Sequence, residues 1–302
     1  RTPLPSRTPR IGLALGSGSA RGWAHLGVIR ALERAGIPVD VVCGTSVGAL
    51  VGAAYAAGQV QRLDAWVCSL TWQSVLNLMD LKISGGLIQG ARLVEFFRSH
   101  FQDQDIAQLP RPYGCVATEL TSGREVWLRE GSVVDAVRAS IALPGLLTPV
   151  VHNERLLVDG GLVNPVPVSL CRALGAEIVV AVDLNWDLIG RRSQVPAEVK
   201  AAEGPADAGM LESLFARFRQ PRANGNGGAI QVPSMLDVLT TSLNVMQVRI
   251  TQSRLAGEPA DVVIRPRLSG IAAMDFHRGA VAAAEGERAA EQAILMIREL
   301  AA

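Results

Sequence analysis

The sequence predicts an α/β protein with a mostly parallel sheet wrapped by helices. Short apolar runs typical of buried strands alternate with longer patterns typical of helices, which is the order expected of βαβ units. Glycine or proline follows the first helical patterns and ends them. Hydrophobic residues make up 49% of the 302 residues and charged residues only 19%, so the chain can bury a sizeable core.

The elements can be assigned in order from the first strand. Ile11–Leu15 (IGLAL) is an apolar run typical of a buried strand, and a helix is expected over residues 21–35 because Gly36 and Pro38 end it. The other expected strands are 39–43, 113–118, 125–128, 155–158, 177–184 and 261–265. The other expected helices are 46–57, 132–140, one from about 166, 235–255 and 276–300.

The chain is expected to form a single domain, residues 11–302, behind a polar tail of residues 1–10. The tail lacks the apolar segment of a secretory signal, so a cytoplasmic location is expected. Peripheral association with a membrane is the alternative expectation. Around residues 186–232 the composition shifts toward Gly, Pro, Ala, Arg and Asn, which predicts a flexible or lid-like insert. Residues 210–219 (MLESLFARFR) carry an apolar stripe that fits a lipid surface, although packing on the protein's own core is favoured.

Charge and cysteine content exclude several classes of function. The 29 Lys and Arg residues against 28 Asp and Glu give a net charge of +1 without a basic block, so no nucleic-acid partner is expected. The four cysteines form no CxxC or Cys/His cluster. We therefore expect no metal site, no cofactor and no disulfide scaffold, and thiols that are free and mostly buried. Residues 41–61 are uncharged, but a catalytic motif explains them better than a membrane span.

That motif is GxSxG within VVCGTSVG (41–48). An apolar strand runs directly into it and a helix follows, the context in which a serine lies on a sharp turn with its Oγ exposed. Gly44 and Gly48 lack the Cβ atoms that would clash in so tight a bend. The amides that begin the following helix point toward charge developing near the serine. Ser46 is therefore the predicted nucleophile, and Gly44 and Gly48 belong to its elbow.

A glycine-rich loop after the first strand is the predicted oxyanion hole. Gly16, Ser17, Gly18 and Ser19 precede a helix, and successive backbone N–H groups in such a loop bind anions. A dinucleotide site is the competing interpretation, because the glycines also fit GxGxxxG. That site needs an acidic residue at the end of the next strand, whereas Asp40 lies at its start, so nucleotide binding is disfavoured.

Two arrangements compete for the base that activates Ser46. A hydrolase triad would run serine, acid, histidine, for example Ser46, Asp261 and His277. However, His277 begins a helix without the context of a strand end, and a structural role is the default for His25 on the first helix. A Ser–Asp dyad would use Asp159, which ends the apolar run RLLVD and precedes two glycines that allow close backbone approach. Asp159 is the stronger candidate.

Four sequence blocks resemble the bacterial patatin-like phospholipases, in the branch related to the catalytic domain of neuropathy target esterase. The blocks are GSGSARGWAHLGVIRALERAGI (16–37), GTSVGALVGAAYAAG (44–58), ASIALPGLLTP (139–149) and VDGGLVNPVPV (158–168), in the family's order. The family often has an unbroken glycine run where this chain has Ser17 and Ser19. The Cβ atoms of these serines restrict positive φ at both positions.

The resemblance implies a patatin-like three-layer α/β/α fold with a mostly parallel central sheet and a dyad without histidine. In that scheme Ser46 attacks an acyl ester carbonyl, and Asp159 takes the hydroxyl proton and passes it to the leaving alcohol. Water then releases the acyl-enzyme, while residues 16–19 form the oxyanion hole. A free Asp, with a pKa of about 3.9, is a poor base for a serine. Burial at the strand end should therefore raise the pKa of Asp159.

The resemblance also favours lipid or lysolipid acyl esters as substrates. An apolar stretch at residues 66–72 and 75–79 could flank an acyl groove and equally could be ordinary core. Arg21 is a candidate contact for a phosphate, or a brace of the loop. Two other classes stay open, namely a serine esterase, thioesterase or acyltransferase on soluble acyl donors, and a lipid-binding regulatory protein with low turnover. The oligomeric state is not indicated.

Overall fold

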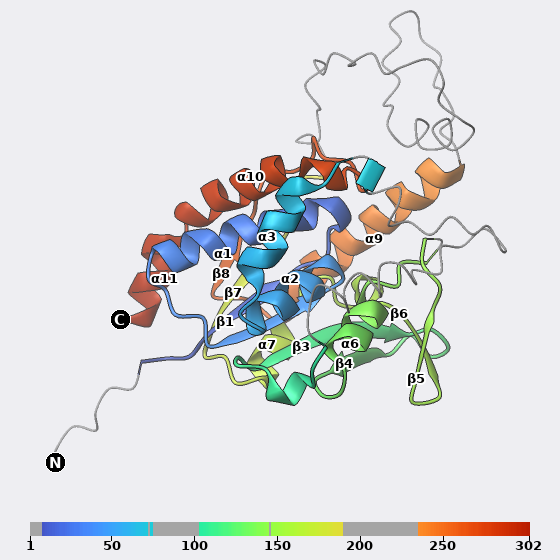
Figure 1. Cartoon of the computed structure of the whole chain (residues 1–302), viewed down its shortest axis with the longest axis horizontal. Coiled ribbons are helices and arrows are strands. Elements are labelled where there is room, and N and C mark those ends of the chain that lie inside the picture. The colour runs from blue at the N-terminus through green and yellow to red at the C-terminus, as the bar shows by residue number, and fades with distance from the viewer. Residues whose placement is uncertain (1–7, 72, 75–102, 145, 190–234) are drawn as a thin grey trace, which may run out of the picture.

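One eight-stranded sheet organises the computed structural model, which describes residues 8–71, 73–74, 103–144, 146–189 and 235–302 (Figure 1). The strands are β1 (Ile11–Leu15), β2 (Val41–Thr45), β3 (Tyr113–Glu119), β4 (Glu125–Leu128), β5 (Val150–His152), β6 (Arg155–Asp159), β7 (Ile178–Val182) and β8 (Val262–Ile264). Their order is β5-β6-β3-β2-β1-β7-β8, with β4 paired to β3 beside this path. The pairs among β3, β2, β1, β7 and β8 are parallel, which confirms the mostly parallel sheet.

Helices connect most of these strands. The α-helices are α1 (Ala24–Arg34), α2 (Val47–Ala56), α3 (Val60–Ser69), α6 (Val133–Ser140), α7 (Val168–Ala173), α9 (Met235–Gly257), α10 (Gly279–Glu291) and α11 (Ile294–Ala301). The short 3-10 turns are η1 (Ser19–Trp23), η2 (Ile106–Gln108), η3 (Gly160–Leu162) and η4 (Phe276–Arg278).

Helices cover both faces of the sheet, which gives three layers. Side chains of Ile11, Leu13 and Leu15 in β1 enter the larger core cluster together with residues of α1, α2, α3 and α10. Ala14 points to the opposite face and packs in a second cluster with residues of α7, among them Leu170. Figure 1 shows α1 and α10 side by side above the sheet and α7 below it. Because strand side chains alternate between faces, one strand fills both interfaces, and the expected α/β/α layering is confirmed.

Most of the expected elements are present, and the differences have local causes. The second strand starts at Val41, two residues later than expected. Just before it, Asp40 bonds to Ile11 partly through its side chain, because its carboxylate accepts from the Ile11 N–H at 2.8 Å. The helix expected over 276–300 is divided into η4, α10 and α11. The strand β5 was not expected, since it has only three residues and depends on a hairpin turn at Asn153 and Glu154, both with positive φ.

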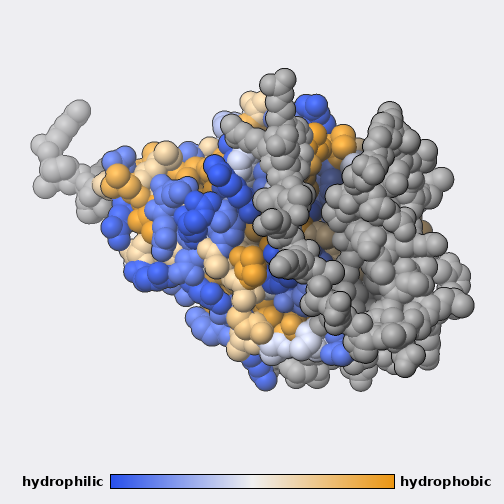
Figure 2. All heavy atoms as spheres, turned by 90° about the horizontal axis from the view of Figure 1, so that it is seen from above, coloured by the Kyte–Doolittle hydropathy of each residue, from blue (hydrophilic) through white to orange (hydrophobic). Residues whose placement is uncertain are grey.

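The thiols are free, and Cys43, Cys115 and Cys171 are buried while Cys68 is exposed. Among the described residues, no helix combines the length and apolarity needed to cross a membrane. On the face seen in Figure 2, the described hydrophobic residues lie in small groups among hydrophilic ones. The expected tail residues 1–7, the apolar residues 75–79, the helix at 210–219 and nearly all of the insert lie outside the described residues.

Candidate active site

Three loops meet at the edge of the sheet where the parallel strands end. The first two strands are paired with Leu15 opposite Gly44, so the glycine-rich loop and the serine elbow leave the sheet side by side. Asp159, at the end of β6, lies opposite Ala117 of β3, and β3 pairs in turn with β2. In open α/β sheets, this carboxyl edge is where ligands bind.

The serine elbow is strained and closely packed. Ser46 has φ 57° and ψ −125°, a conformation that L-residues rarely adopt and that is often found at functional sites. A Cβ atom on Gly48 would lie 2.2 Å from the carbonyl oxygen of Leu15, and one on Gly44 would lie 2.2 Å from the backbone of Gly48. The two glycines of GxSxG therefore let the elbow pass directly over the end of β1.

The backbone of the elbow is held by Ser140, the last residue of α6. The Ser46 N–H donates to Ser140 Oγ at 2.9 Å, and Ser140 Oγ donates to the carbonyl oxygen of Val116 at 2.6 Å. Ser140 is fully buried, so this hydroxyl links the elbow to β3 without competition from solvent. The Ser46 amide is consequently committed to the fold, and the side chain is left to act.

The side chains of Ser46 and Asp159 are in direct contact. Ser46 Oγ donates to Asp159 Oδ2 at 2.6 Å, and Asp159 Oδ1 accepts from the Gly161 N–H at 2.7 Å. Asp159 is only 1% exposed. Burial raises the pKa of Asp159 to about 6, while its hydrogen bonds from Ser46 and Gly161 oppose the rise. A carboxyl group with this pKa can accept a hydroxyl proton near neutral pH and return it.

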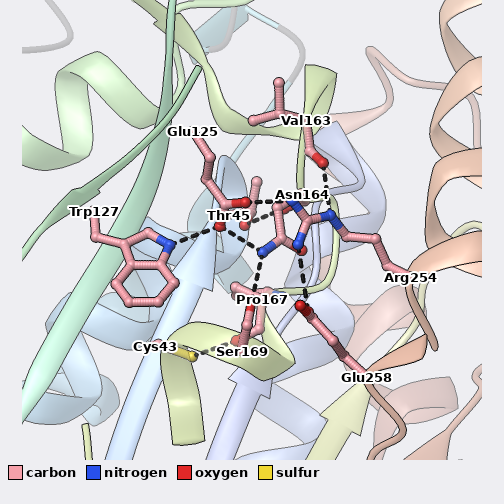
Figure 3. A network of polar contacts seen from close by, with 10 residues as sticks. All are labelled: Cys43, Thr45, Glu125, Trp127, Val163, Asn164, Pro167, Ser169, Arg254 and Glu258. Carbon is pink, nitrogen blue, oxygen red and sulfur yellow. Dashed lines mark hydrogen bonds and ion pairs between the residues drawn. The ribbon is translucent and has the colours of Figure 1, made fainter. Parts of the chain in front are cut away.

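A polar network behind the elbow holds the segment that follows Asp159 (Figure 3). The backbone carbonyl oxygen of Asn164 accepts from Thr45 Oγ1 at 2.8 Å, and the side-chain amide of Asn164 donates to Glu125 Oε1 at 2.7 Å. The other oxygen of Glu125 is paired with Arg254 of α9, which also donates to the carbonyl oxygen of Val163 at 3.0 Å. The network thereby joins β2, β4 and α9 around the loop that carries the carboxylate.

In the glycine-rich loop, two of the four predicted donors are used by the fold and two stay candidates for binding an anion. Of the four predicted donors, the Gly16 N–H is bonded to the Val182 oxygen at 3.1 Å and the Ser17 N–H to the Pro165 oxygen at 2.8 Å. No backbone acceptor is found for the N–H groups of Gly18 and Ser19 within the described parts of the chain. Ser19 adopts φ 50°, the positive region that the sequence had made unfavourable for it. The candidate oxyanion donors are therefore Gly18 and Ser19.

His25 supports this loop from beneath. Its Nε2 lies 2.7 Å from the carbonyl oxygen of Gly16, and because that oxygen can only accept, Nε2 carries the hydrogen. The side chain is completely buried, and burial lowers the pKa of His25 to about 4. A neutral histidine bonded to the backbone is a structural residue, as the sequence indicated.

Arg21 lies inside the protein instead of in an open cleft. It is 4% exposed, and its guanidinium donates to the carbonyl oxygen of Ile271 at 3.4 Å and to Asn244 Oδ1 at 3.5 Å. Burial lowers the pKa of Arg21 to about 10, against the opposing effect of Asp187. These contacts correspond to the second predicted role, in which Arg21 braces the loop, and a phosphate contact stays a prediction.

The alternative triad is not assembled. Asp261 immediately precedes β8 and accepts from the Val179 N–H near the start of β7, at the opposite edge of the sheet from the Ser46 elbow. Its carboxylate is also paired with Arg172 at 2.7 Å. Asp261 therefore cannot orient a histidine at Ser46.

The sequence analysis missed three residues around the site: Ser140, Asn185 and Gln247. Ser140 lies within the block ASIALPGLLTP, so the resemblance marked its segment without indicating its bond to the elbow. Gln247 lies in the expected helix 235–255, and nothing in a helical pattern distinguishes a glutamine that faces a distant loop.

Comparison with known proteins identifies a family. The family model described as "Patatin-like phospholipase" matches residues 13–172, which is 160 of the 302 residues. An uncharacterized NTE family protein of Mycobacterium tuberculosis is 32% identical over 96% of this chain and 92% of its own length. Human patatin-like phospholipase domain-containing protein 6 is 39% identical over 58% of this chain and 13% of its own length.

Two further matches extend this picture. Lysophospholipase NTE1 of Mycosarcoma maydis is 38% identical over 58% of this chain and 10% of its own length. The crystal structure of VipD from Legionella pneumophila matches with a TM-score of 0.57 over 96% of this chain and 67% of that chain, at 13% sequence identity. The structural match concerns the fold alone.

Proposed function

The chain belongs to the patatin-like phospholipase family, and on that premise we propose that it is a serine hydrolase of lipid acyl esters, of the phospholipase A or lysophospholipase type. The observation that carries the proposal is the 2.6 Å hydrogen bond from Ser46 Oγ to Asp159 Oδ2. Beside it, the N–H groups of Gly18 and Ser19 have no backbone acceptor among the described residues. The names of two relatives, a lysophospholipase and a patatin-like phospholipase domain-containing protein, support a lipid substrate.

The proposed mechanism has two steps. Ser46 Oγ attacks the ester carbonyl carbon while Asp159 Oδ2 accepts the hydroxyl proton, and the N–H groups of Gly18 and Ser19 bind the oxygen that becomes negative. Asp159 then gives the proton to the leaving alcohol, which leaves the acyl group on Ser46. In the second step Asp159 accepts a proton from water, whose oxygen attacks the acyl-enzyme, and the proton returns to Ser46 Oγ as the fatty acid leaves.

Labelling with a fluorophosphonate tests the chemistry directly. The reagent should form an adduct on Ser46, mapped by mass spectrometry, and Ser46→Ala should form none while retaining its fold. Hydrolysis of lysophospholipid should exceed hydrolysis of short p-nitrophenyl esters and acyl-CoA. An adduct elsewhere, or none on folded protein, would refute the enzyme mechanism. Faster turnover of the soluble esters would instead favour an esterase or thioesterase.

We further propose that residues 11–302 form one hydrolase domain, because strands from Ile11 to Ile264 share one sheet and α10 and α11 pack in its core. We also propose that the flexible or lid-like insert expected around residues 186–232 belongs to this domain.

Contact with a lipid surface is also proposed, on one side of α9. The side chains of Val238, Leu239, Val245 and Met246 are 42, 53, 38 and 48% exposed. Because their positions repeat after seven residues, they form one apolar stripe, which we call the α9 stripe. A lipid surface is the fitting partner, since the buried side of the same helix borders the candidate site and the proposed substrate resides in lipid.

A further inference from the structure

We propose that Gln247 of α9 is a positioning residue that holds the oxyanion loop through Ser17 and Asn185. This inference rests on the proposed hydrolase function and adds to it a residue outside the dyad and the loop. It assigns to α9 a role in the chemistry, although the helix contributes no group that touches the ester.

The three side chains form a buried hydrogen-bonded cluster. Gln247 Oε1 accepts from Ser17 Oγ at 3.2 Å and from Asn185 Nδ2 at 3.1 Å. Asn185 Nδ2 also lies 3.3 Å from the carbonyl oxygen of Ser17. Exposed fractions of 8% for Gln247 and 2% each for Ser17 and Asn185 mean that solvent does not replace these bonds. The cluster therefore joins the loop after β1, the segment after β7 and α9.

The cluster holds Ser17, which directly precedes the candidate oxyanion donors Gly18 and Ser19. Backbone bonds from Gly16 and Ser17 to Val182 and Pro165 hold the beginning of the loop. Beyond them, the Ser17 side chain is the attachment that directly precedes Gly18 and Ser19. Where the family often has glycine, this chain has a hydroxyl group, and that group reaches Gln247. The same helix makes a second contact with this segment: Asn244 Oδ1 accepts from the Arg21 guanidinium at 3.5 Å.

Gln247 also lies against the carboxylate segment. A Cβ atom on Gly161 would stand 2.6 Å from Gln247 Nε2 and 3.0 Å from Asp159 Oδ1, so these two groups flank the same glycine. The Gly161 N–H is the donor that holds Asp159 Oδ1. One glutamine side chain thus touches the oxyanion loop on one side and the support of the base on the other.

Loss of the bond between Gln247 and Ser17 should reduce stabilisation of the transition state more than it reduces substrate binding. The oxyanion forms only during reaction, so displaced Gly18 and Ser19 amides lower kcat and leave KM nearly unchanged. Removal of an oxyanion donor costs about 10²–10³-fold in other hydrolases, and displacement of the loop should cost less, about tenfold.

The test uses two variants, their combination and a matched control in the full chain. Gln247→Met keeps the side-chain volume and removes the acceptor, and Ser17→Ala removes the hydroxyl and keeps the Cβ atom. Each should lower kcat for a short p-nitrophenyl ester about tenfold at unchanged KM. The double variant should lose no more than the worse single variant, because both changes break the same bond between Ser17 Oγ and Gln247 Oε1. Gln252→Met alters an exposed glutamine of the same helix, bonded to Arg249, and should leave kcat unchanged.

Three outcomes would overturn the inference. They are an unchanged kcat in folded Gln247→Met and Ser17→Ala, multiplicative losses in the double variant, or a rise in KM that accounts for the loss. If Gln247→Met does not fold, Ser17→Ala alone decides, since it removes only one hydroxyl. The proposed function fails separately: in that case wild-type activity would be absent or would persist in Ser46→Ala.

Discussion

At the scale of single residues, the carboxyl group of Asp159 is held where its ionised form is costly. Burial raises the pKa of Asp159 from 3.8 to about 6, although two hydrogen bonds stabilise the carboxylate. Between these pH values the folded protein binds more protons than the unfolded chain, so its stability falls as pH rises through this range. The folded protein is therefore less stable at neutral pH because it carries the proposed base.

Replacement of this carboxyl should separate activity from stability. In Asp159→Asn the amide can still accept from the Gly161 N–H and donate to Ser46 Oγ, without a charge. Hydrolysis should fall by about 10²–10⁴-fold, while the free energy of unfolding rises by roughly 2–3 kcal/mol at pH 8. Urea unfolding at pH 8 and pH 4 measures the difference, which should be small at pH 4. An equal gain at both pH values would contradict the assignment of the raised pKa.

The pH dependence of hydrolysis should report the same group. The mechanism needs Asp159 ionised, and its pKa is about 6, so kcat/KM should rise with pH and reach half its plateau near pH 6. Below that midpoint the rate should fall about tenfold per pH unit. Circular dichroism at each pH serves as the control for folding. A profile that is flat between pH 5 and 7 would exclude Asp159 as the base.

At the scale of elements, the end of α6 holds the proposed nucleophile in place. Ser140 bonds both the Ser46 N–H and the Val116 carbonyl oxygen. Val116 is fully buried, so its carbonyl oxygen cannot bond to solvent instead if the Ser140 hydroxyl is removed. The last residue of α6 thus holds the strained turn at Ser46.

Ser140→Ala should therefore reduce both stability and activity. Leaving the buried carbonyl oxygen of Val116 unpaired costs about 1–3 kcal/mol, and a less constrained elbow should lower kcat about tenfold. Ser132→Ala is the matched control at the other end of α6, because Ser132 Oγ caps the helix by accepting from the Asp135 N–H. The control should lose about 1 kcal/mol and keep its kcat. Equal kcat values in both variants would argue against a role for Ser140 in placing Ser46.

The α9 stripe should determine attachment to lipid without affecting the chemistry. Leu239→Ser combined with Met246→Ser should lower the fraction of protein that sediments with phospholipid vesicles, and should leave hydrolysis of a soluble short ester unchanged. Val281→Ser combined with Leu295→Ser is the control, since these side chains are also exposed, on α10 and α11. Equal sedimentation of the two double variants would refute the stripe as the lipid contact.

At the scale of the whole molecule, the direction of the strands brings Asp159, and not Asp261, to the side of the sheet where Ser46 lies. Ser46 follows the end of β2, whereas Asp261 precedes the start of β8, a strand that runs in the same direction. Ser46 and Asp261 are therefore at opposite ends of the parallel strands. Because β6 pairs with β3 in antiparallel register, Asp159 lies at the same end as Ser46.

Variants of the rejected triad should consequently remain active. His277→Ala and Asp261→Asn should each keep kcat within about twofold of wild type, because the proposed mechanism uses neither group. Asp261→Asn will lose some stability, since its carboxylate is paired with Arg172 and bonded to the Val179 N–H. A loss of activity in either variant comparable with that of Asp159→Asn would restore the triad.

Sequence patterns predict the α/β class, most of the strands and helices, the serine elbow and the two candidate catalytic residues. These features are local, because strand and helix periodicity and the close backbone approach at Gly44 and Gly48 depend on residues near one another in the sequence. The sequence could not show which amides of residues 16–19 are free, since Val182 and Pro165 occupy two of them from distant segments.

The geometry of the candidate site, in contrast, depends on contacts between distant segments of the chain. The contact of Ser46 with Asp159, 113 residues away, depends on how β2, β3 and β6 are ordered in the sheet. The pKa of Asp159 depends on burial by surrounding elements, and the roles of Ser140 and Gln247 depend on what their helices happen to face. Hydrogen bonding and desolvation act over a few ångströms of space irrespective of separation along the chain, so no local pattern encodes them.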